Sequence, residues 1–342
     1  MRSLLRRVAS TRTGHRLTRV AARTSGRPGR IGRIGEAADR LLAASMYDDS
    51  YYRSDPGGCR GGRSGYADYR RPTSNADALA VALTTWLDVD RVLDVGCAAG
   101  FFVEASRELG LDARGIDVSG AAFDLADPDV RPHLDVLDLT AGLDEPTRSR
   151  GLVTAFEVLE HLPPDAAPAA TAELRRVAAS YVVATIPSYG ANASGPDGWF
   201  EGKVRDAVLD RYRDRGDPSG GPVPLTDLAR DDDGRLVEGH QTIASYAWWT
   251  ARFNEAGLVR CPDTELLLHH DLARYGLREF VCLYVFRRPE ADEPVSPLRS
   301  GEEVAALEDR LGLLDHGAPV AHVDEAAADL AARGLSPRVG PG

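Results

Sequence analysis

Short apolar runs alternate with helix-like segments between residues 91 and 186, and this alternation constrains the fold more than any other feature. The runs that we interpret as strands lie at 91–95, 113–118, 134–139, 152–156 and 181–186. Helical periodicity separates them, most clearly at 101–109 and 165–179. Strands that alternate with helices usually pair in parallel, with helices covering both faces of the sheet. The sequence therefore predicts an open α/β fold.

Segments outside this alternation set the domain boundaries that we expect. Eleven Arg against Glu36 and Asp39 give residues 1–40 a charge of 11 − 2 = +9. The same segment has too few apolar residues to offset the entropy cost of ordering, so we expect a basic disordered tail. Residues 41–88 follow as a cap that is rich in Tyr and Gly and ends in a helix at about 75–87.

The α/β domain is expected to span 89–287 and to contain an insertion at 188–240 that is rich in Gly, Pro and Asp. One helix-like run lies inside the insertion, at 201–213. After the insertion the pattern predicts a helix at about 242–257, strands near 258–268 and 279–287, and an acidic extension at 288–342 with a helix candidate at 302–314.

Composition excludes several classes of protein. The formal net charge is −11, so the chain beyond the basic tail carries −11 − 9 = −20, which argues against duplex nucleic acid as a partner. No stretch approaches the ~20 apolar residues that span a bilayer. The four cysteines are scattered without a C-x-x-C pair, which favours a reducing, cytoplasmic location. Lys203 is the only lysine beside 40 arginines, a bias that resembles GC-rich coding.

A strand, a loop of small residues and a helix follow one another at 92–102. Backbone N–H groups in such a loop can approach a ligand closely, and the helix N-terminus adds a positive potential. A dinucleotide site would carry G-x-G-x-x-G, whereas this loop has Gly96, Ala98 and Gly100. Asp94 at its entrance would repel a pyrophosphate but suits a cationic amine or sulfonium. The alternative is a strand–turn–helix corner that binds no ligand.

Two more carboxylates follow the next two strands. Asp117 ends the second strand, 21 residues after Gly96, where an acidic side chain can accept both ribose hydroxyls of a nucleoside. Asp138 ends the third strand and could accept from an adenine amino group. The alternative for Asp117 is a residue that caps the next helix, and the alternative for Asp138 is a solvated turn residue.

The segment 152–162 follows the fourth strand to the carboxyl edge of the sheet, where ligands bind in open α/β folds. Its Glu157, Glu160 and His161 could serve as a base, an orienting group or ligands of a hard metal ion. Alternatively, they cap the following helix and hold the loop.

Together, the motifs at 94–102, 115–119 and 156–162 resemble those of the class I S-adenosylmethionine-dependent methyltransferases. The nearest branch bears the E-V-L-E-H-L signature and includes ubiquinone-biosynthesis O-methyltransferases and many sugar and natural-product methyltransferases. The resemblance covers roughly 65–287. It implies S-adenosylmethionine as the cofactor and a Rossmann-like, doubly wound sheet of seven strands, mostly parallel with an antiparallel last strand.

The resemblance also implies a cofactor site. The residues expected to surround the cofactor are Asp94, Gly96, Cys97, Ala98, Gly100, Phe101, Asp117, Val118, Asp138, Leu139, Phe156 and Glu157. Asp117 would hold the ribose, and Asp138 with Leu139 would flank the adenine. Ala98 departs from the family, which usually has Gly there. Some relatives use a divalent ion at a Glu-x-x-Glu-His arrangement, but here we expect these groups to cap and brace, without a metal.

The expected reaction is methyl transfer to a small-molecule acceptor, at a hydroxyl of a sugar, a natural product or a similar metabolite. A base must then take the hydroxyl proton, and the candidates are His161 and His240. The candidate substrate residues are Tyr66, Tyr69 and Trp199. Two other functions stay open: a non-catalytic module that binds S-adenosylmethionine, and an NAD-type oxidoreductase, which would need G-x-G-x-x-G.

Overall fold

The structure is a computed structural model that describes residues 69–190, 192, 200, 202–213, 220–230, 234, 236–277 and 282–313. The expected tail at 1–40, most of the cap at 41–88 and the end of the acidic extension lie outside these ranges. Tyr66 and Trp199 lie outside them too.

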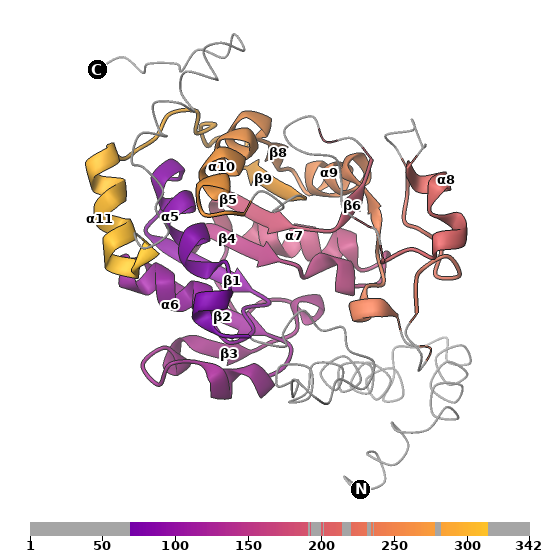
Figure 1. The fold of residues 1–342 in the computed structure, drawn as a ribbon, viewed down its shortest axis with the longest axis horizontal. Coiled ribbons are helices and arrows are strands. Elements are labelled where there is room, and N and C mark those ends of the chain that lie inside the picture. Colours follow the sequence, from indigo (N-terminus) through magenta and orange to yellow (C-terminus); the bar gives the residue numbers. More distant parts are fainter. Residues whose placement is uncertain are drawn as a thin grey trace, which may run out of the picture.

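A seven-stranded sheet forms the centre of the molecule, in the strand order β3-β2-β1-β4-β5-β9-β8 (Figure 1). Its strands are β1 (Arg91–Val95), β2 (Asp112–Asp117), β3 (Leu134–Val136), β4 (Arg150–Phe156), β5 (Ala178–Thr185), β8 (Val259–Arg260) and β9 (Leu283–Arg287). The first five pair in parallel, and β9 runs antiparallel between β5 and β8. The predicted Rossmann-like sheet with an antiparallel last strand is therefore confirmed.

Helices cover both faces of the sheet because successive strand residues point to opposite sides. In β1, Val92 belongs to one core and Leu93 to the other. The first core packs against α5 (Ala76–Trp86), α6 (Phe101–Glu108) and α10 (Pro262–Arg274). The second packs against α7 (Ala167–Val177) and α9 (Tyr246–Glu255).

Two secondary-structure predictions were wrong. The strand expected near 258–268 ends after β8, and α10 begins at Pro262. Pro at the first helical position is pre-organised for a helix, and acidic residues in the first turn favour a helix N-terminus. The helix expected at 201–213 is, in its described part, only the 3-10 turn η6 (Asp206–Val208) and the short α8 (Asp210–Arg213).

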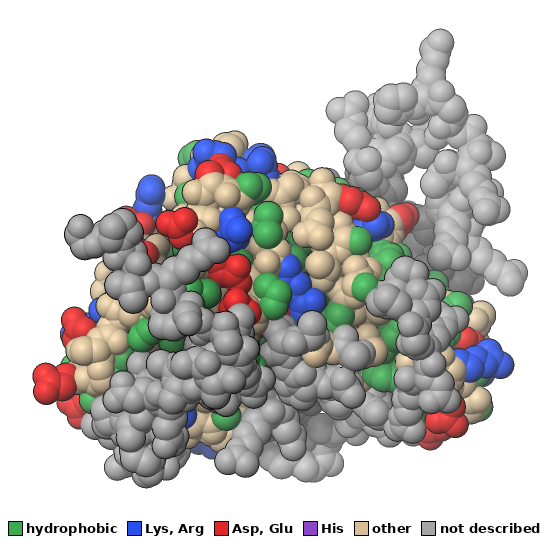
Figure 2. Space-filling view, turned by 90° about the horizontal axis from the view of Figure 1, so that it is seen from above, with side chains coloured by type: hydrophobic (Ala, Val, Ile, Leu, Met, Phe, Trp, Pro, Cys, Tyr) green, Lys and Arg blue, Asp and Glu red, His purple; other side chains and the backbone are tan. Residues whose placement is uncertain are grey.

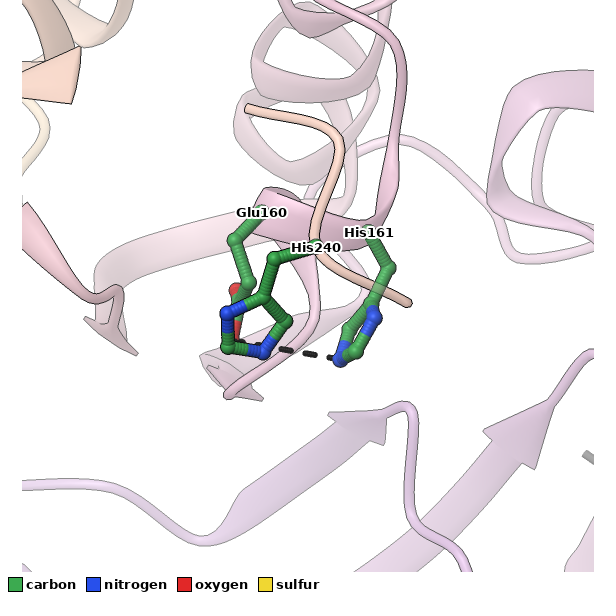
Figure 3. Close-up of side chains that lie close together, drawn as sticks. All are labelled: Glu160, His161 and His240. Carbon is green, nitrogen blue, oxygen red and sulfur yellow. Dashed lines mark ion pairs between the residues drawn. The ribbon is translucent and has the colours of Figure 1, made fainter. Parts of the chain in front are cut away.

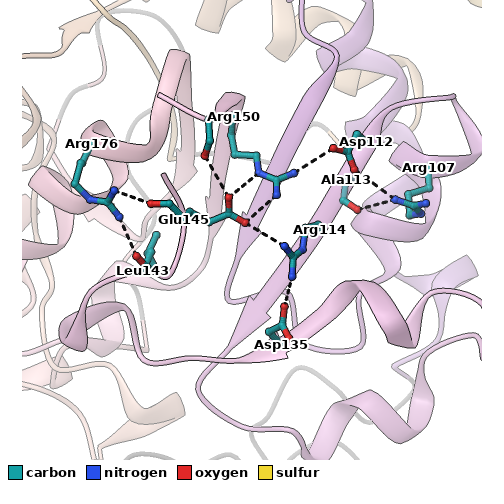
Figure 4. Close-up of polar contacts among 10 residues, drawn as sticks. Arg107, Asp112, Ala113, Arg114, Asp135, Leu143, Glu145, Arg150 and Arg176 are labelled. Atoms are coloured by element: carbon teal, nitrogen blue, oxygen red, sulfur yellow. Dashed lines mark hydrogen bonds and ion pairs between the residues drawn. The ribbon is translucent and has the colours of Figure 1, made fainter. Parts of the chain in front are cut away.

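An ionic network ties the sheet together near the amino ends of its strands (Figure 4). Arg150 at the start of β4 binds the Glu145 carboxylate through two nitrogens, at 2.8 and 3.1 Å. The same guanidinium lies 3.6 Å from Asp112 at the start of β2, and Arg114 binds Asp135 at 2.5 Å. These charges occupy the edge opposite the loops at 96–100 and 157–162, so the carboxyl edge is where a ligand site would form.

The insertion and the C-terminal helix lie on opposite sides of the molecule in Figure 1. The insertion has its own small core, which includes Tyr189, Phe200 and Tyr212. Its ends meet in a two-stranded parallel sheet, β6 (Ser188–Tyr189) with β7 (Ala244–Ser245).

The helix α11 (Gly301–Leu311) packs on α5 and α6. Its buried Glu308 accepts hydrogen bonds from Arg274 at 2.7 Å and Tyr275 at 2.6 Å, which fixes α11 to α10. On the face that Figure 2 shows, acidic and basic side chains are interspersed among neutral and hydrophobic ones. Within the described ranges, no helix is both long and apolar enough to cross a membrane.

Candidate cofactor and acceptor site

The loop between β1 and α6 takes three left-handed residues, Gly96 (φ 75°), Ala98 (φ 46°) and Gly100 (φ 73°). The N–H groups of Gly96 and Cys97 donate to the carbonyl of Ile116 at 2.7 and 3.0 Å, which ties the loop to β2. Glycine reaches this conformation without strain, whereas the Cβ of Ala98 makes it costly. The departure of Ala98 from the family pattern therefore has a local conformational cost.

Gly96 also allows a close approach between two motifs. A Cβ added at Gly96 would lie 2.3 Å from Cγ2 of Val158, which belongs to the loop after β4. No real side chain tolerates that separation, so glycine here lets the loops after β1 and β4 pack together.

Asp117 lies at the carboxyl end of β2 and is 6% exposed. One carboxylate oxygen accepts from the N–H of Ala98 at 2.9 Å, and the other accepts from the N–H of Ser119 at 2.9 Å. Each carboxylate oxygen can accept more than one hydrogen bond, so these contacts do not exhaust its capacity. The expected ribose-binding residue is therefore fixed against the loop at 96–100.

Asp94 is 4% exposed in β1 and accepts from the Thr154 hydroxyl at 2.7 Å. Burial raises the pKa of Asp94 to about 7; the hydrogen bond from Thr154 opposes this shift, and the charge of Asp117 adds to it. Cys97, next in the loop, is also buried, and burial raises the pKa of its thiol well above the usual value. Cys97 therefore packs and is no nucleophile.

Asp138 begins the 3-10 turn η4 (Leu139–Ala141) and accepts from the N–H and the hydroxyl of Thr140, at 2.8 and 2.6 Å. Asp138 therefore caps this turn, whereas the alternative to adenine binding considered for it was a solvated turn residue. Leu139 beside it is buried. The N–H of Leu137 donates to the carbonyl of Asp117 at 2.9 Å, so the third expected segment adjoins the second.

Aromatic rings flank the loop on two sides. Phe156 at the end of β4 meets Phe102 edge-on, with ring centroids 5.3 Å apart. Tyr69 lies 4.9 Å from Phe101, the first residue of α6. Tyr69, one of the expected substrate residues, therefore lies beside the start of α6, which follows the loop at 96–100.

The segment after β4 makes a sharp turn and then forms the 3-10 turn η5 (Leu159–His161). Glu157 adopts a left-handed conformation with φ 54°, and its N–H donates to the carbonyl of Thr185 at 3.0 Å. Glu160 is 0% exposed. Its carboxyl adjoins that of Glu157, and burial together with the charge of Glu157 raises the pKa of Glu160 well above its usual value.

The end of the insertion docks on this segment, although the two are 80 residues apart in sequence. The N–H groups of Gln241 and Thr242 donate to the carbonyl of Glu160 at 2.8 and 2.9 Å. The side chain of Gln241 donates to the carbonyl of His161 at 2.6 Å. These bonds carry His240, which follows η7 (Val237–Gly239), to the carboxyl edge of β4.

Glu160, His161 and His240 point toward one another, as Figure 3 shows. Oε1 of Glu160 lies 4.0 Å from Nε2 of His161 and 3.9 Å from Nε2 of His240. Burial lowers the pKa of His161 to about 4 and that of His240 well below its usual value. Both imidazoles are therefore neutral at pH 7, and each keeps a nitrogen lone pair.

Lys203 is a site residue that sequence reasoning did not select. It is 3% exposed and forms an ion pair with Glu238, which holds a left-handed φ of 53°. Burial lowers the pKa of Lys203 to about 8, against the charges of Glu157 and Glu160. The available signal was its status as the only lysine, which we attributed to coding bias.

The segment after β4 and the residue that follows η7 bring three donor side chains together. Among the described residues, the three side chains whose ligand atoms all lie within 4.8 Å of one another are Glu160, His161 and His240. Glu157 is not in this group, but its carboxyl interacts with the side chains of both Thr185 and Glu160.

Comparison with known families defines the class of this protein. The family model described as "Methyltransferase domain" matches residues 66–278, well over half of the chain. The match contains the loop at 96–100, Asp117, the E-V-L-E-H-L segment and the insertion. The chain therefore belongs to the methyltransferase domain family, and its class uses S-adenosylmethionine as cofactor.

Curated relatives share shorter stretches. The ubiquinone biosynthesis O-methyltransferase of Cupriavidus pinatubonensis is 33% identical over 102 residues, which are 28% of this chain and 41% of the relative. The protein of the same name from Paraburkholderia phymatum is 35% identical over 79 residues, 21% of this chain and 34% of the relative. The chain thus spans less than half the length of these relatives.

Among solved structures, an S-adenosylmethionine-dependent methyltransferase from Mesorhizobium loti is 16% identical, with a TM-score of 0.40. That comparison covers 64% of this chain and 100% of the other.

Proposed function

We propose that this chain transfers the methyl group of S-adenosylmethionine to a hydroxyl of a small-molecule acceptor. The observation that carries the proposal is the pair formed by His161 and His240 at the carboxyl edge of β4, with ring centroids 4.8 Å apart. That edge adjoins the loop at 96–100 through the contact between Gly96 and Val158.

The cofactor half of the site would be supplied by the first three strands. Asp94 would face the cationic methionine part, Asp117 would accept the ribose hydroxyls, and Asp138 with Leu139 would flank the adenine. The packing of Asp117 on the loop supports this arrangement, because the carboxylate and the loop N–H groups are held in one place. The sulfonium already activates the methyl group, so the protein has mainly to align the acceptor and exclude water.

The acceptor half would be supplied by His161 and His240. As the new bond from oxygen to carbon forms, the bond from carbon to sulfur breaks and its electron pair returns to the sulfur. The acceptor hydroxyl must lose its proton in the same step. A neutral imidazole can take that proton, and it can equally bind a cation that makes the hydroxyl more acidic.

The acceptor class that we propose is a hydroxylated sugar, natural product or similar metabolite. The curated relatives are ubiquinone biosynthesis O-methyltransferases, which favours oxygen as the methylated atom. Tyr69 beside the loop, with Tyr66 and Trp199, would contact the acceptor.

The test is to incubate full-length protein with S-adenosylmethionine and a panel of hydroxylated sugars, phenols and other natural products, and to follow products by mass spectrometry. We expect one acceptor to gain one CH₂ unit, and fragmentation to place it on oxygen. A product methylated on nitrogen or carbon would contradict the proposal. So would the absence of any product from a protein that binds the cofactor.

A further inference from the structure

Arg71 binds three carboxylates that come from two different helices. Its Nε donates to Asp77 of α5 at 2.9 Å. Its terminal nitrogens donate to Glu104 at 2.7 Å and to Glu108 at 2.6 and 2.7 Å, both on α6. The Arg71 side chain is 17% exposed. One guanidinium therefore fixes the 3-10 turn η1 (Arg71–Thr73), which precedes α5, against α6.

The two glutamates on α6 are unfavourable for the helix by itself. Glu104 and Glu108 are four residues apart, where like charges destabilise a helix. Glu108 is also the last residue of α6, and a negative charge at a helix C-terminus is disfavoured. The hydrogen bond from Arg71 lowers the pKa of Glu108, so the pairing stabilises its charged form. The contribution of the two glutamates is therefore to hold Arg71.

Tyr69, two residues before Arg71, lies at the other end of α6. Its ring centroid is 4.9 Å from that of Phe101, the first residue of the helix. Phe101 directly follows Gly100, which ends the loop at 96–100. The segment 69–71 thus lies along α6, with the ring at the end that carries the loop and the guanidinium toward the opposite end.

The backbone that joins the ring to the guanidinium is held in place. The N–H of Ser74 donates to the carbonyl of Arg70 at 3.0 Å, and its hydroxyl donates to the carbonyl of Arg71 at 2.7 Å. Pro72 follows with a fixed φ. The position of Arg71 therefore determines where the chain presents Tyr69.

We propose that Arg71 is a positioning residue for the cofactor site, because its ion pairs with Glu104 and Glu108 hold the Tyr69 ring against Phe101. This role deepens the proposed function and rests on it for the reaction that the site carries out. A ring that is fixed beside the loop excludes water there, and a cofactor that binds loses less free energy to ordering it.

The test measures by calorimetry how tightly the full-length protein binds the demethylated product of S-adenosylmethionine. Arg71→Met removes the ion pairs and Tyr69→Ala removes the ring, and each should weaken binding about 3–10-fold, the effect of ordering one side chain. Because Arg71 acts through Tyr69, the double variant should bind as Tyr69→Ala does. Tyr69→Phe keeps the ring and should bind like the wild type. The control Arg91→Met removes a half-exposed arginine beside Asp90 and should leave the affinity unchanged.

Three results would overturn this role: wild-type affinity in Arg71→Met, losses that multiply in the double variant, or a loss in Tyr69→Phe as large as in Tyr69→Ala. Denaturant unfolding identifies any variant that does not fold. If Arg71→Met is not folded, Glu104→Gln combined with Glu108→Gln relieves the repulsion on α6 and must show the same loss and the same coupling to Tyr69→Ala.

Failure of the proposed function is distinguishable from failure of this role. A protein that shows the coupling between Arg71 and Tyr69 but methylates no hydroxyl would sink only the proposed function. A protein that methylates a hydroxyl but lacks the coupling would sink only the positioning role of Arg71.

Discussion

The backbone N–H of Ala98 donates to Oδ2 of Asp117 at 2.9 Å, and this bond joins the loop after β1 to the end of β2. Two parts of the proposed cofactor site that lie 19 residues apart in the sequence are therefore held together by the protein itself. A ligand that meets a locked site loses less free energy to ordering it. The strained left-handed conformation of Ala98 is held in place partly by this contact.

Asp117→Asn should weaken cofactor binding. Hydrogen bonds to a charged acceptor contribute about 1.5–3 kcal/mol, so we expect the affinity for S-adenosylmethionine to fall about 10–150-fold. Calorimetry with the cofactor and with its demethylated product measures the loss. Asp90→Asn, which changes an exposed carboxylate next to β1, is the matched control and should bind normally. If Asp117→Asn binds S-adenosylmethionine with wild-type affinity, Asp117 does not bind the ribose.

Gly96→Ala should destabilise the fold through Val158. The added Cβ would meet Cγ2 of Val158 at 2.3 Å, and overpacking of this kind costs about 1–3 kcal/mol. The left-handed φ of Gly96 adds a further cost of about 1–2 kcal/mol. In a double variant, Val158→Ala should recover the steric part only. Denaturant unfolding of the wild type, the two single variants and the double variant gives the coupling free energy between Gly96→Ala and Val158→Ala. Strictly additive changes in the free energy of unfolding would show that the added methyl group does not clash with Val158.

Asp94 should make folding stability depend on pH. Its folded pKa of about 7 lies above the ordinary value of 3.8 because the carboxyl is buried. Between these values the folded state keeps a proton that the unfolded state has lost. The contribution of Asp94 is therefore complete below about pH 4 and is lost as the pH rises to about 7.

The check is the free energy of unfolding of the cofactor-free protein across that pH range. Relative to Asp94→Asn, which cannot titrate, the wild type should lose stability from pH 4 to pH 7 and then change little. Parallel curves for the two proteins would mean that Asp94 is ionised throughout.

Glu308→Gln should loosen α11 without touching the cofactor site. The change keeps the shape of the side chain but removes the charge that accepts from Arg274 and Tyr275. We expect a loss of about 1.5–3 kcal/mol in the free energy of unfolding, measured with denaturant. Cofactor affinity should stay the same, and the exposed Glu302→Gln on the same helix should have no effect on either quantity. Weaker cofactor binding in Glu308→Gln would show that α11 supports the site.

Local patterns were enough to predict the strands of the sheet and the loop of small residues between β1 and α6. β1 and β4 read as apolar runs because both of their faces are buried, and the small residues after β1 mark a loop that approaches its neighbours closely. Interpreting a short apolar run as a strand failed at Leu266–Leu268, because this run is part of α10. A buried strand and a buried helix face look alike over so few residues, and Pro262 was the better guide.

The acceptor side depended on contacts that no local pattern contains. Glu160 and His161 could be selected from their motif, but their meeting with His240 results from the docking of Gln241 and Thr242. The Gln241 side chain and the His161 carbonyl are 80 residues apart, so their contact depends on the tertiary fold and not on a local sequence pattern. Lys203 shows the same limit, because its burial follows from the folding of the insertion.

The position of Lys203 has a practical consequence for watching this protein at work. It is the only lysine among 342 residues, and it stands where the insertion meets the segment after β4. Protein grown with isotope-labelled lysine would give one side-chain resonance. That single signal would report on the proposed acceptor side of the molecule, with no assignment needed.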